Sequence, residues 1–211
     1  MTSLKHVSLT VALFFAFYLL PGCSTSVLVN QWSDSSYKGP PLNKIMVIAV
    51  RNDPTRRRVW EDVFIGELSR HGVNATQSYQ LFPNAIPDSL QIAGAVAKYA
   101  FDGIIITRRL PKVVNTHYVN GYVTQESETK YSERKQRFFT YYRDVDHPGF
   151  VDTQKIANRS IDVWTTDSTS RMVWSAISET PEPATPDAVH RDVVSLVTGE
   201  LERKGILPKV K

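Results

Sequence analysis

The sequence has a single cysteine and no apolar run that could cross a membrane. Among 211 residues only Cys23 carries a thiol, which excludes an internal disulfide. The apolar run Val11–Leu20 has about half of the ~20 residues that a membrane-spanning helix needs, and the stretch Ser24–Lys38 that follows is polar. We therefore expect no permanent transmembrane helix.

Motifs of catalysis and metal binding are also missing. There is no G-x-S-x-G turn, and Ser, His and Asp form no arrangement that specifies a catalytic triad. The histidines after the N-terminal region are scattered, with no pair at metal-ligand spacing: His71, His117, His147 and His190. Asp144, Asp146 and Asp152 lack the glycine and the distal glutamate of a calcium loop. We expect no enzyme, no metal and no cofactor.

The sequence does hold the composition of an ordinary globular protein. It is 42% hydrophobic, 22% charged and 10% aromatic, which argues against a disordered chain and against a multi-span membrane protein. Its length suffices to bury one core. The formal net charge of +4 is too small to indicate a partner.

The N-terminus has the architecture of a signal peptide. A mildly basic start, Met1–His6, precedes the apolar run, and small or turn-forming residues follow it. The tetrapeptide Leu20-Pro21-Gly22-Cys23 resembles the lipobox of bacterial lipoproteins. The resemblance implies a leader over residues 1–22, acylation of Cys23 as the lipid attachment site, and, with serine at position 24, the outer membrane with the domain in the periplasm. The alternative is a plain secretory leader with a coincidental cysteine.

Hydrophobic periodicity then predicts the elements of one α/β domain over residues 43–207, after a linker over 23–42 that holds a short strand at Val27–Trp32. The expected elements are a buried strand at Ile45–Val50, a helix from the Asp53 cap to Gly72 that buries Val59, Val63, Phe64 and Leu68, a strand at Val73–Tyr79, a helix from Asp88 or Ser89 that buries Ile92, Val96 and Ala100, and a strand at Ile104–Thr107. This is a βαβαβ start.

The C-terminal part has a different pattern. Ser160–Thr166 and Met172–Ile177 alternate apolar and polar residues around the polar turn Asp167–Ser170, which is typical of an antiparallel hairpin. Thr185 and Pro186 then begin a helix that ends at Gly205. The predicted fold is α/β with a mixed sheet, in which the C-terminal helix packs on the sheet.

The domain also resembles a known group of proteins. The resemblance rests on Trp32, Asp34, Tyr37-Lys38-Gly39-Pro40, Lys44–Val50, Asp102-Gly103, Ile104–Thr107 and Val173-Trp174-Ser175. On these residues the chain is similar to uncharacterised bacterial lipoproteins with a domain of unknown function, and more distantly to the α/β domain superfamily of the curli-secretion lipoprotein. The resemblance implies the fold and no catalytic residue.

The segment Lys112–Gly149 is the most unusual stretch, since it holds five of the nine tyrosines without a sustained apolar period. We expect it to project from the core. Between Lys130 and Arg143 five basic residues stand against Glu133 alone. The candidate partner surface is Tyr131, Arg134, Lys135, Arg137, Tyr141, Tyr142 and Arg143. Export argues against nucleic acid, so an envelope protein or an anionic glycan is the expected partner. A structural hairpin with solvated arginines is the alternative.

Two function classes remain open. The first is a non-enzymatic accessory or assembly factor of the envelope, held on the membrane by its N-terminal acyl chains. The second is a periplasmic lipoprotein that binds a small molecule or glycan at the carboxyl ends of the parallel strands, near Arg51, Thr107 and Arg108. The run Arg56–Arg58 is interpreted as a solvated helix face, because it lacks the glycine-rich turn of an anion site.

Overall fold

The computed structural model describes residues 26–168, 170–181 and 186–209. The predicted leader, the lipobox with Cys23 and the predicted cap Thr185 lie outside the described residues. Within the described part of the chain, the helices are too short or too polar to span a membrane.

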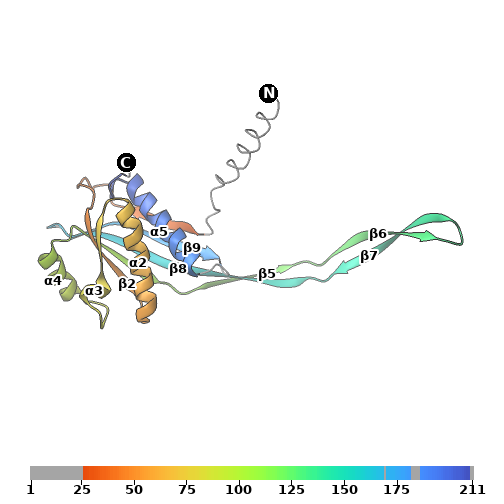
Figure 1. The fold of residues 1–211 in the computed structure, drawn as a ribbon, viewed down its shortest axis with the longest axis horizontal. Coiled ribbons are helices and arrows are strands. Elements are labelled where there is room, and N and C mark those ends of the chain that lie inside the picture. Colours follow the sequence, from red (N-terminus) through yellow and green to blue (C-terminus); the bar gives the residue numbers. More distant parts are fainter. Residues whose placement is uncertain (1–25, 169, 182–185, 210–211) are drawn as a thin grey trace, which may run out of the picture.

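The fold is built on a mixed seven-stranded sheet (Figure 1), which confirms the predicted fold class. Its strands are β1 (Val27–Ser33), β2 (Lys44–Val50), β3 (Asn74–Gln77), β4 (Gly103–Arg109), β5 (Val113–Val119), β8 (Phe150–Thr165) and β9 (Met172–Pro181). They lie in the order β1-β9-β8-β4-β2-β3, and β5 pairs with the first half of β8. Only β2 pairs in parallel, with β3 and β4; the other pairs are antiparallel. The βαβαβ start and the following hairpin β8–β9 are both present.

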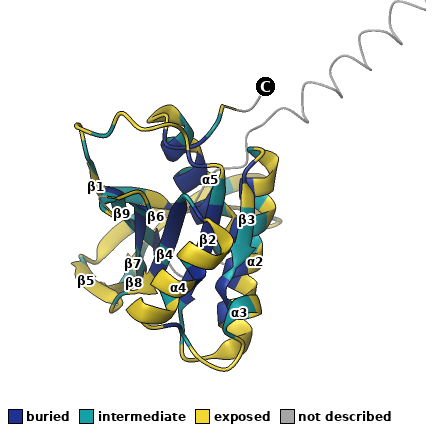
Figure 2. Cartoon of the chain, turned by 90° about the vertical axis from the view of Figure 1, so that its left-hand side faces the viewer, coloured by how far each residue is buried: buried dark blue, intermediate teal, exposed yellow. Residues whose placement is uncertain are grey.

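Helices cover both faces of this sheet. Within the described residues the helices are α2 (Pro54–Arg70), the single turn α3 (Ser78–Leu81), α4 (Ser89–Tyr99) and α5 (Pro186–Arg203). On one face α2 and α5 bury Phe64 and Val197 against Ile105 and its neighbours. On the other face α4 packs Ala95 near Met46. Figure 2 shows buried strands in the centre of the sheet and the exposed outer side of α4.

Helix α2 buries a face that overlaps only in part with the predicted one. Trp60, Phe64 and Leu68 are buried, whereas Val59 is 37% exposed and Val63 is half-buried. The buried stripe also includes Arg57 and Glu61, which are 4% and 0% exposed. The predicted stripe was therefore partly wrong, because charged residues occupy two core-facing positions.

The ends of two other elements, β3 and α4, also differ from the predicted ones. The second predicted strand ends at Gln77 because the next residues form α3, where the Tyr79 amide donates to the Glu61 carboxylate. In α4 the buried residue is Ala95, while Ala100 is exposed at the helix end in the left-handed conformation, with φ of 52°. Asp88 caps α4 as predicted, through a capping box with Gln91.

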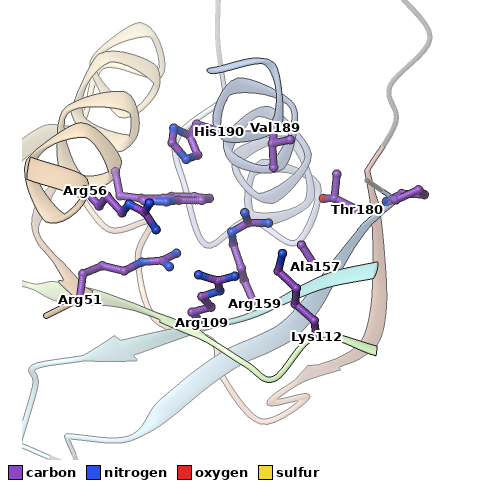
Figure 3. A pocket seen from close by; sticks show the side chains of 11 residues that line it. Arg51, Arg56, Arg109, Lys112, Ala157, Arg159, Thr180, Val189 and His190 are labelled. Carbon is purple, nitrogen blue, oxygen red and sulfur yellow. The ribbon is translucent and has the colours of Figure 1, made fainter. Parts of the chain in front are cut away.

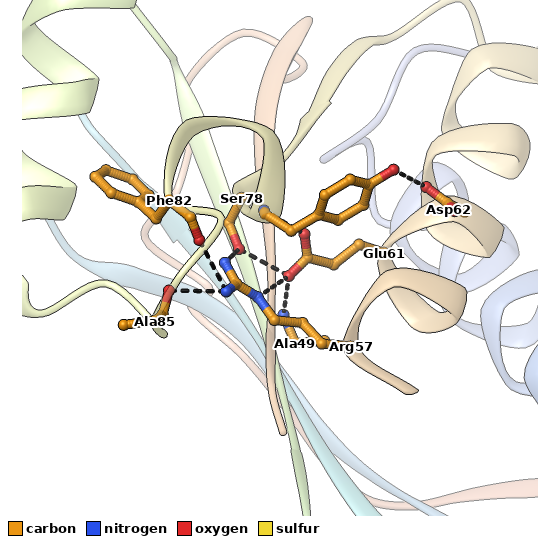
Figure 4. Close-up of polar contacts among 8 residues, drawn as sticks. Ala49, Arg57, Glu61, Asp62, Ser78, Phe82 and Ala85 are labelled. Carbon is orange, nitrogen blue, oxygen red and sulfur yellow. Dashed lines mark hydrogen bonds and ion pairs between the residues drawn. The ribbon is translucent and has the colours of Figure 1, made fainter. Parts of the chain in front are cut away.

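A buried ion pair explains the charged residues inside α2, and it corrects the interpretation of Arg57 as solvated (Figure 4). The Arg57 Nε lies 3.1 Å from Glu61 Oε1, one helical turn apart. The other guanidinium nitrogens donate to Ser78 Oγ at 2.8 Å and to the carbonyls of Phe82 and Ala85 at 3.0 and 2.7 Å. Each of the three guanidinium nitrogens thus has at least one hydrogen-bond acceptor, as burial of the charge requires.

Besides the bond from Arg57, the Glu61 carboxylate accepts hydrogen bonds from two other parts of the chain, β2 and α3. The Ala49 amide of β2 donates at 3.0 Å, the Tyr79 amide of α3 at 2.9 Å, and Ser78 Oγ at 2.7 Å. Charged hydrogen bonds of this kind are about twice as strong as neutral ones. The ion pair therefore joins α2, β2 and α3 at one point.

Replacement of Arg57 by methionine should destabilise the fold strongly. The variant leaves Glu61 buried without its cation, which costs roughly 3–5 kcal/mol of unfolding free energy. Urea denaturation followed by circular dichroism measures this loss. The matched control is Arg58→Met, which removes an exposed arginine from the same helix and should leave the midpoint unchanged. Equal stability of the two variants would contradict the role assigned to the buried pair, and addition of Glu61→Gln should recover part of the loss.

Candidate binding cavity and projecting arm

A long two-stranded arm extends from the sheet (Figure 1). Its base is the pairing of β5 with β8, from Val113 opposite Ile156 to Val119 opposite Phe150. Its outer part is the pair β6 (Tyr122–Ser132) and β7 (Arg137–His147). Strands rise roughly 3.3 Å per residue, so the stretch from β5 to the end of β6 spans roughly 60 Å. The segment 112–149 thus supplies most of the arm.

A glycine lets the two halves of the arm join. A Cβ on Gly121 would lie 2.8 Å from both the His147 carbonyl oxygen and the Gly149 amide nitrogen, closer than real side chains come to backbone. A side chain at this position would therefore push the two strands apart where the base meets the outer part.

One face of the outer arm is charged but internally paired. Arg143 lies 3.0 Å from Glu126 on the opposite strand, and the Glu126 carboxylate raises the pKa of the Arg143 guanidinium. Lys130 lies 3.1 Å from Glu128. Exposed pairs of this kind contribute little to stability. They do, however, neutralise two of the cations on this charged face.

The opposite face, which we term the aromatic face, carries Tyr131, Phe138 and Tyr142. These side chains are 53%, 71% and 67% exposed. Tyr131 and Phe138 are directly opposite each other, with ring centroids 5.0 Å apart. Tyr142 is on the same side because it stands an even number of residues from Phe138 along β7. Between them lies the uncharged pair Thr129 and Thr140, whose hydroxyls are 2.9 Å apart.

The structure distributes the predicted partner residues over three places. Tyr131 and Tyr142 lie on the aromatic face, and Arg137, Tyr141 and Arg143 lie on the charged face. Arg134 and Lys135 lie in the turn between β6 and β7. Lys135 and Arg137 stand over the Phe139 ring at 4.9 and 4.7 Å. The prediction missed Phe138, which the alternation of residues along a strand could have grouped with Tyr142.

A cavity of about 300 Å³ lies at the end of the sheet from which the arm leaves (Figure 3). It is bounded by the carboxyl ends of β2 and β4, the first turns of α2 and α5, and the end of β9. Its described lining residues are Arg51, Arg56, Trp60, Arg109, Lys112, Ala157, Arg159, Thr180, Pro181, Val189 and His190. Five of them are arginine or lysine, and none is acidic.

The electrostatics of the cavity are unfavourable for its own cations. The Nε and Nη2 atoms of Arg51 are buried and make no hydrogen bond within the described part of the chain. Burial, together with the neighbouring charges of Arg109 and Arg56, lowers the pKa of the Arg51 guanidinium. The Trp60 ring offsets part of this cost, because Arg51 and Arg159 stand 5.3 and 4.9 Å from its centroid.

The predicted ligand position is only partly the observed one. Arg51 lines the cavity, but Thr107 is fully buried, and Arg108 lies on the other side of the sheet, 3.3 Å from Asp162. Arg109 takes part instead, because alternate residues of β4 point to opposite faces. Arg159 is far from Arg109 in sequence, and the pairing of β4 with β8 places the two directly opposite each other; Lys112 follows in the connection to β5. Among the described residues no group of three potential metal ligands occurs.

Fold and cavity define a mixed α/β domain with a basic cavity and a projecting arm. No protein-family model and no curated protein matches the chain. Among solved structures, the PelC dodecamer from Paraburkholderia phytofirmans is similar at 10% identity and a TM-score of 0.45, over 87% of this chain and 99% of that chain. A variant of that dodecamer is similar at 9% identity and a TM-score of 0.44, over 82% of this chain and 96% of that chain. A PDZ domain protein from Parabacteroides distasonis is similar at 10% identity and a TM-score of 0.37, over 90% of this chain and 39% of that chain.

These likenesses are distant and carry no information on function. The resemblance to uncharacterised lipoproteins and to the curli-secretion superfamily stays a prediction.

Replacement of the two neighbouring arginines of β4 by neutral residues should shift the melting temperature in opposite directions. Arg109→Gln removes a positive charge near Arg51 and should raise the melting temperature at low ionic strength by a few degrees. Arg108→Gln removes the partner of the largely buried Asp162 and should lower the melting temperature. Thermal unfolding at about 0.01 M and about 0.3 M salt tests both, since salt screens the repulsion. A lower melting temperature for both variants would show that the cations of the cavity are not in conflict.

Proposed function

We propose that this chain is a lipid-anchored protein of the bacterial envelope, an accessory or assembly factor whose arm binds another envelope protein. The observation that carries the proposal is the arm itself, whose outer strands leave the α/β core and expose aromatic side chains. Tyrosine is among the residues enriched at binding hot spots, so exposed tyrosines on such an arm favour contact with a partner. An arm that served only the fold would have no need to extend roughly 60 Å from the core it supports.

The chemistry of the two faces favours a protein over an anionic glycan. Arg143 and Lys130 are already paired with glutamates of the arm, which reduces their capacity for an external anion. The aromatic face is uncharged between Tyr131 and Tyr142. A protein surface with apolar pockets can cover such a face without leaving a buried charge unpaired.

The expected anchor would tether the domain at the end that carries the arm. Ser26, the first described residue, has its Oγ 2.9 Å from Thr180 Oγ1 of β9, next to the base of the arm. Cys23 stands three residues before it. Acyl chains on Cys23 would therefore hold the arm near the outer membrane, with no need for an apolar patch on the domain.

Acylation of Cys23 is tested by mass spectrometry of the protein from the membrane fraction. The expected result is a chain that begins at Cys23 and carries fatty acyl groups. The Cys23→Ala variant should lose the modification and leave the membrane fraction after high-salt washing. An intact leader, or an unmodified sulfur on the membrane-bound protein, would refute the anchor.

Site-specific photo-cross-linking tests the aromatic face. A photoreactive phenylalanine analogue at position 142 should form one discrete adduct in living cells, and the analogue at position 141 serves as a matched control. Tyr141 is next in sequence and similarly exposed, at 58%, but lies on the charged face. The adduct at 142 should disappear with Phe138→Ser, which truncates the neighbouring aromatic. Equal adducts at both positions, or recovery of glycan in place of protein, would contradict the proposal.

The structure also supplies a clean deletion control. Removal of residues 121–148 joins Asn120 to Gly149 and leaves Val119 opposite Phe150. The new connection is a two-residue Asn-Gly turn, the preferred sequence for a tight hairpin. This variant should fold, keep its melting temperature within a few degrees and lose the partner. Loss of folding would show that the outer arm has a structural role instead.

A further inference from the structure

The basic cavity brings together five cations from three stretches of the chain. Arg51 follows β2, Arg56 is in the first turn of α2, Arg109 ends β4, Lys112 precedes β5, and Arg159 is in β8. Figure 3 shows these side chains directed into one space below α5. Charges of one sign repel one another, so such a convergence raises the energy of the empty protein.

Two of these cations are poorly compensated within the described residues. Among residues 26–168, 170–181 and 186–209, no hydrogen bond reaches Nε or Nη2 of Arg51, and the exposed Arg109 side chain has no ion pair or hydrogen bond. Arg56, by contrast, has Asp53 at 3.4 Å. The lowered pKa of Arg51, caused by burial and by the charges of Arg109 and Arg56, shows the same conflict.

The guanidinium groups are nevertheless held in place. Arg51 and Arg159 both stand over the Trp60 ring, and Trp60 is itself only 2% exposed in the core. A fixed, partly dehydrated guanidinium binds an anion more strongly than a mobile surface lysine does, because less conformational entropy is lost. The cavity is thus organised before any ligand enters.

We infer that this cavity binds the phosphate group of a phosphorylated ligand. A carboxylate carries one negative charge and would balance only one of the two poorly compensated cations, whereas a phosphate monoester carries close to two and offers three oxygens. Planar guanidinium groups match the geometry of phosphate oxygens in pairs. The cavity volume of about 300 Å³ leaves room for more than the phosphate itself.

Two kinds of ligand carry such a phosphate group, a membrane lipid with its headgroup and a free phosphate ester. The position of the cavity is compatible with the first, because Thr180 lines it and is hydrogen-bonded to Ser26, close to the expected anchor. The cavity also opens at the carboxyl ends of the parallel strands, where α/β sheets bind small ligands. The inference goes beyond the proposed function and does not depend on the arm.

Isothermal titration of the full chain with pyrophosphate, at constant ionic strength, tests the inference. The wild-type protein should bind, and the variant Arg51→Gln with Arg109→Gln should bind at least about tenfold more weakly for each arginine lost. Arg58→Gln is the matched control, since it removes the same charge from the exposed side of α2. It should bind as the wild type does.

A second titration separates the two kinds of ligand. Glycerol 3-phosphate and a short-chain phosphatidic acid present the same phosphate group, with and without acyl chains. Tighter binding of the lipid identifies a headgroup, and equal binding identifies a free phosphate ester. The inference is overturned if neither these compounds nor pyrophosphate binds, or if the double variant binds as well as Arg58→Gln while its melting temperature shows that it is folded.

Discussion

The buried ion pair between Arg57 and Glu61 is the constraint on which the rest of the structure depends. Glu61 accepts hydrogen bonds from the Ala49 amide at the end of β2 and from the Tyr79 amide in α3. It therefore fixes the first half of α2 against the carboxyl end of the central parallel strand. A buried pair is not in itself strong evidence for stability. Its effect is positional, because Arg56 and Trp60 are carried on the same turns of α2.

The basic cavity and the base of the arm both lie at this end of the sheet. The end of β2 supplies Arg51, the end of β4 supplies Arg109, and the start of α5 closes the cavity above them. The arm leaves from the same end through β5 and β8, and the chain enters there at Ser26. The buried ion pair, the basic cavity and the start of the arm thus lie at the same end of the sheet. On the opposite face of the sheet, Arg108 is paired with Asp162.

Local patterns in the sequence were sufficient for the order of the elements. Runs such as Ile45–Val50, the Asp88 cap and the alternation around the β8–β9 turn each depend on neighbouring residues, and the structure confirms the fold class built from them. The buried face of α2 was partly mispredicted because Arg57 and Glu61 are normally surface residues and only their mutual contact permits burial. Likewise, the side of the arm on which each tyrosine lies follows from the register of β6 and β7, and the cavity follows from contacts between residues far apart in sequence. Neither could be predicted without the pairing of the strands.

Hydrogen exchange followed by NMR tests the central constraint most directly. If Glu61 holds β2, α2 and α3 together, the amides of Ala49 and Tyr79 should exchange only when the whole domain unfolds, whereas the amides at the outer edges of the arm should exchange orders of magnitude faster. An Ala49 amide that exchanges as fast as those of the arm would contradict the account, because the end of β2 would then open locally and could not hold the cavity in place.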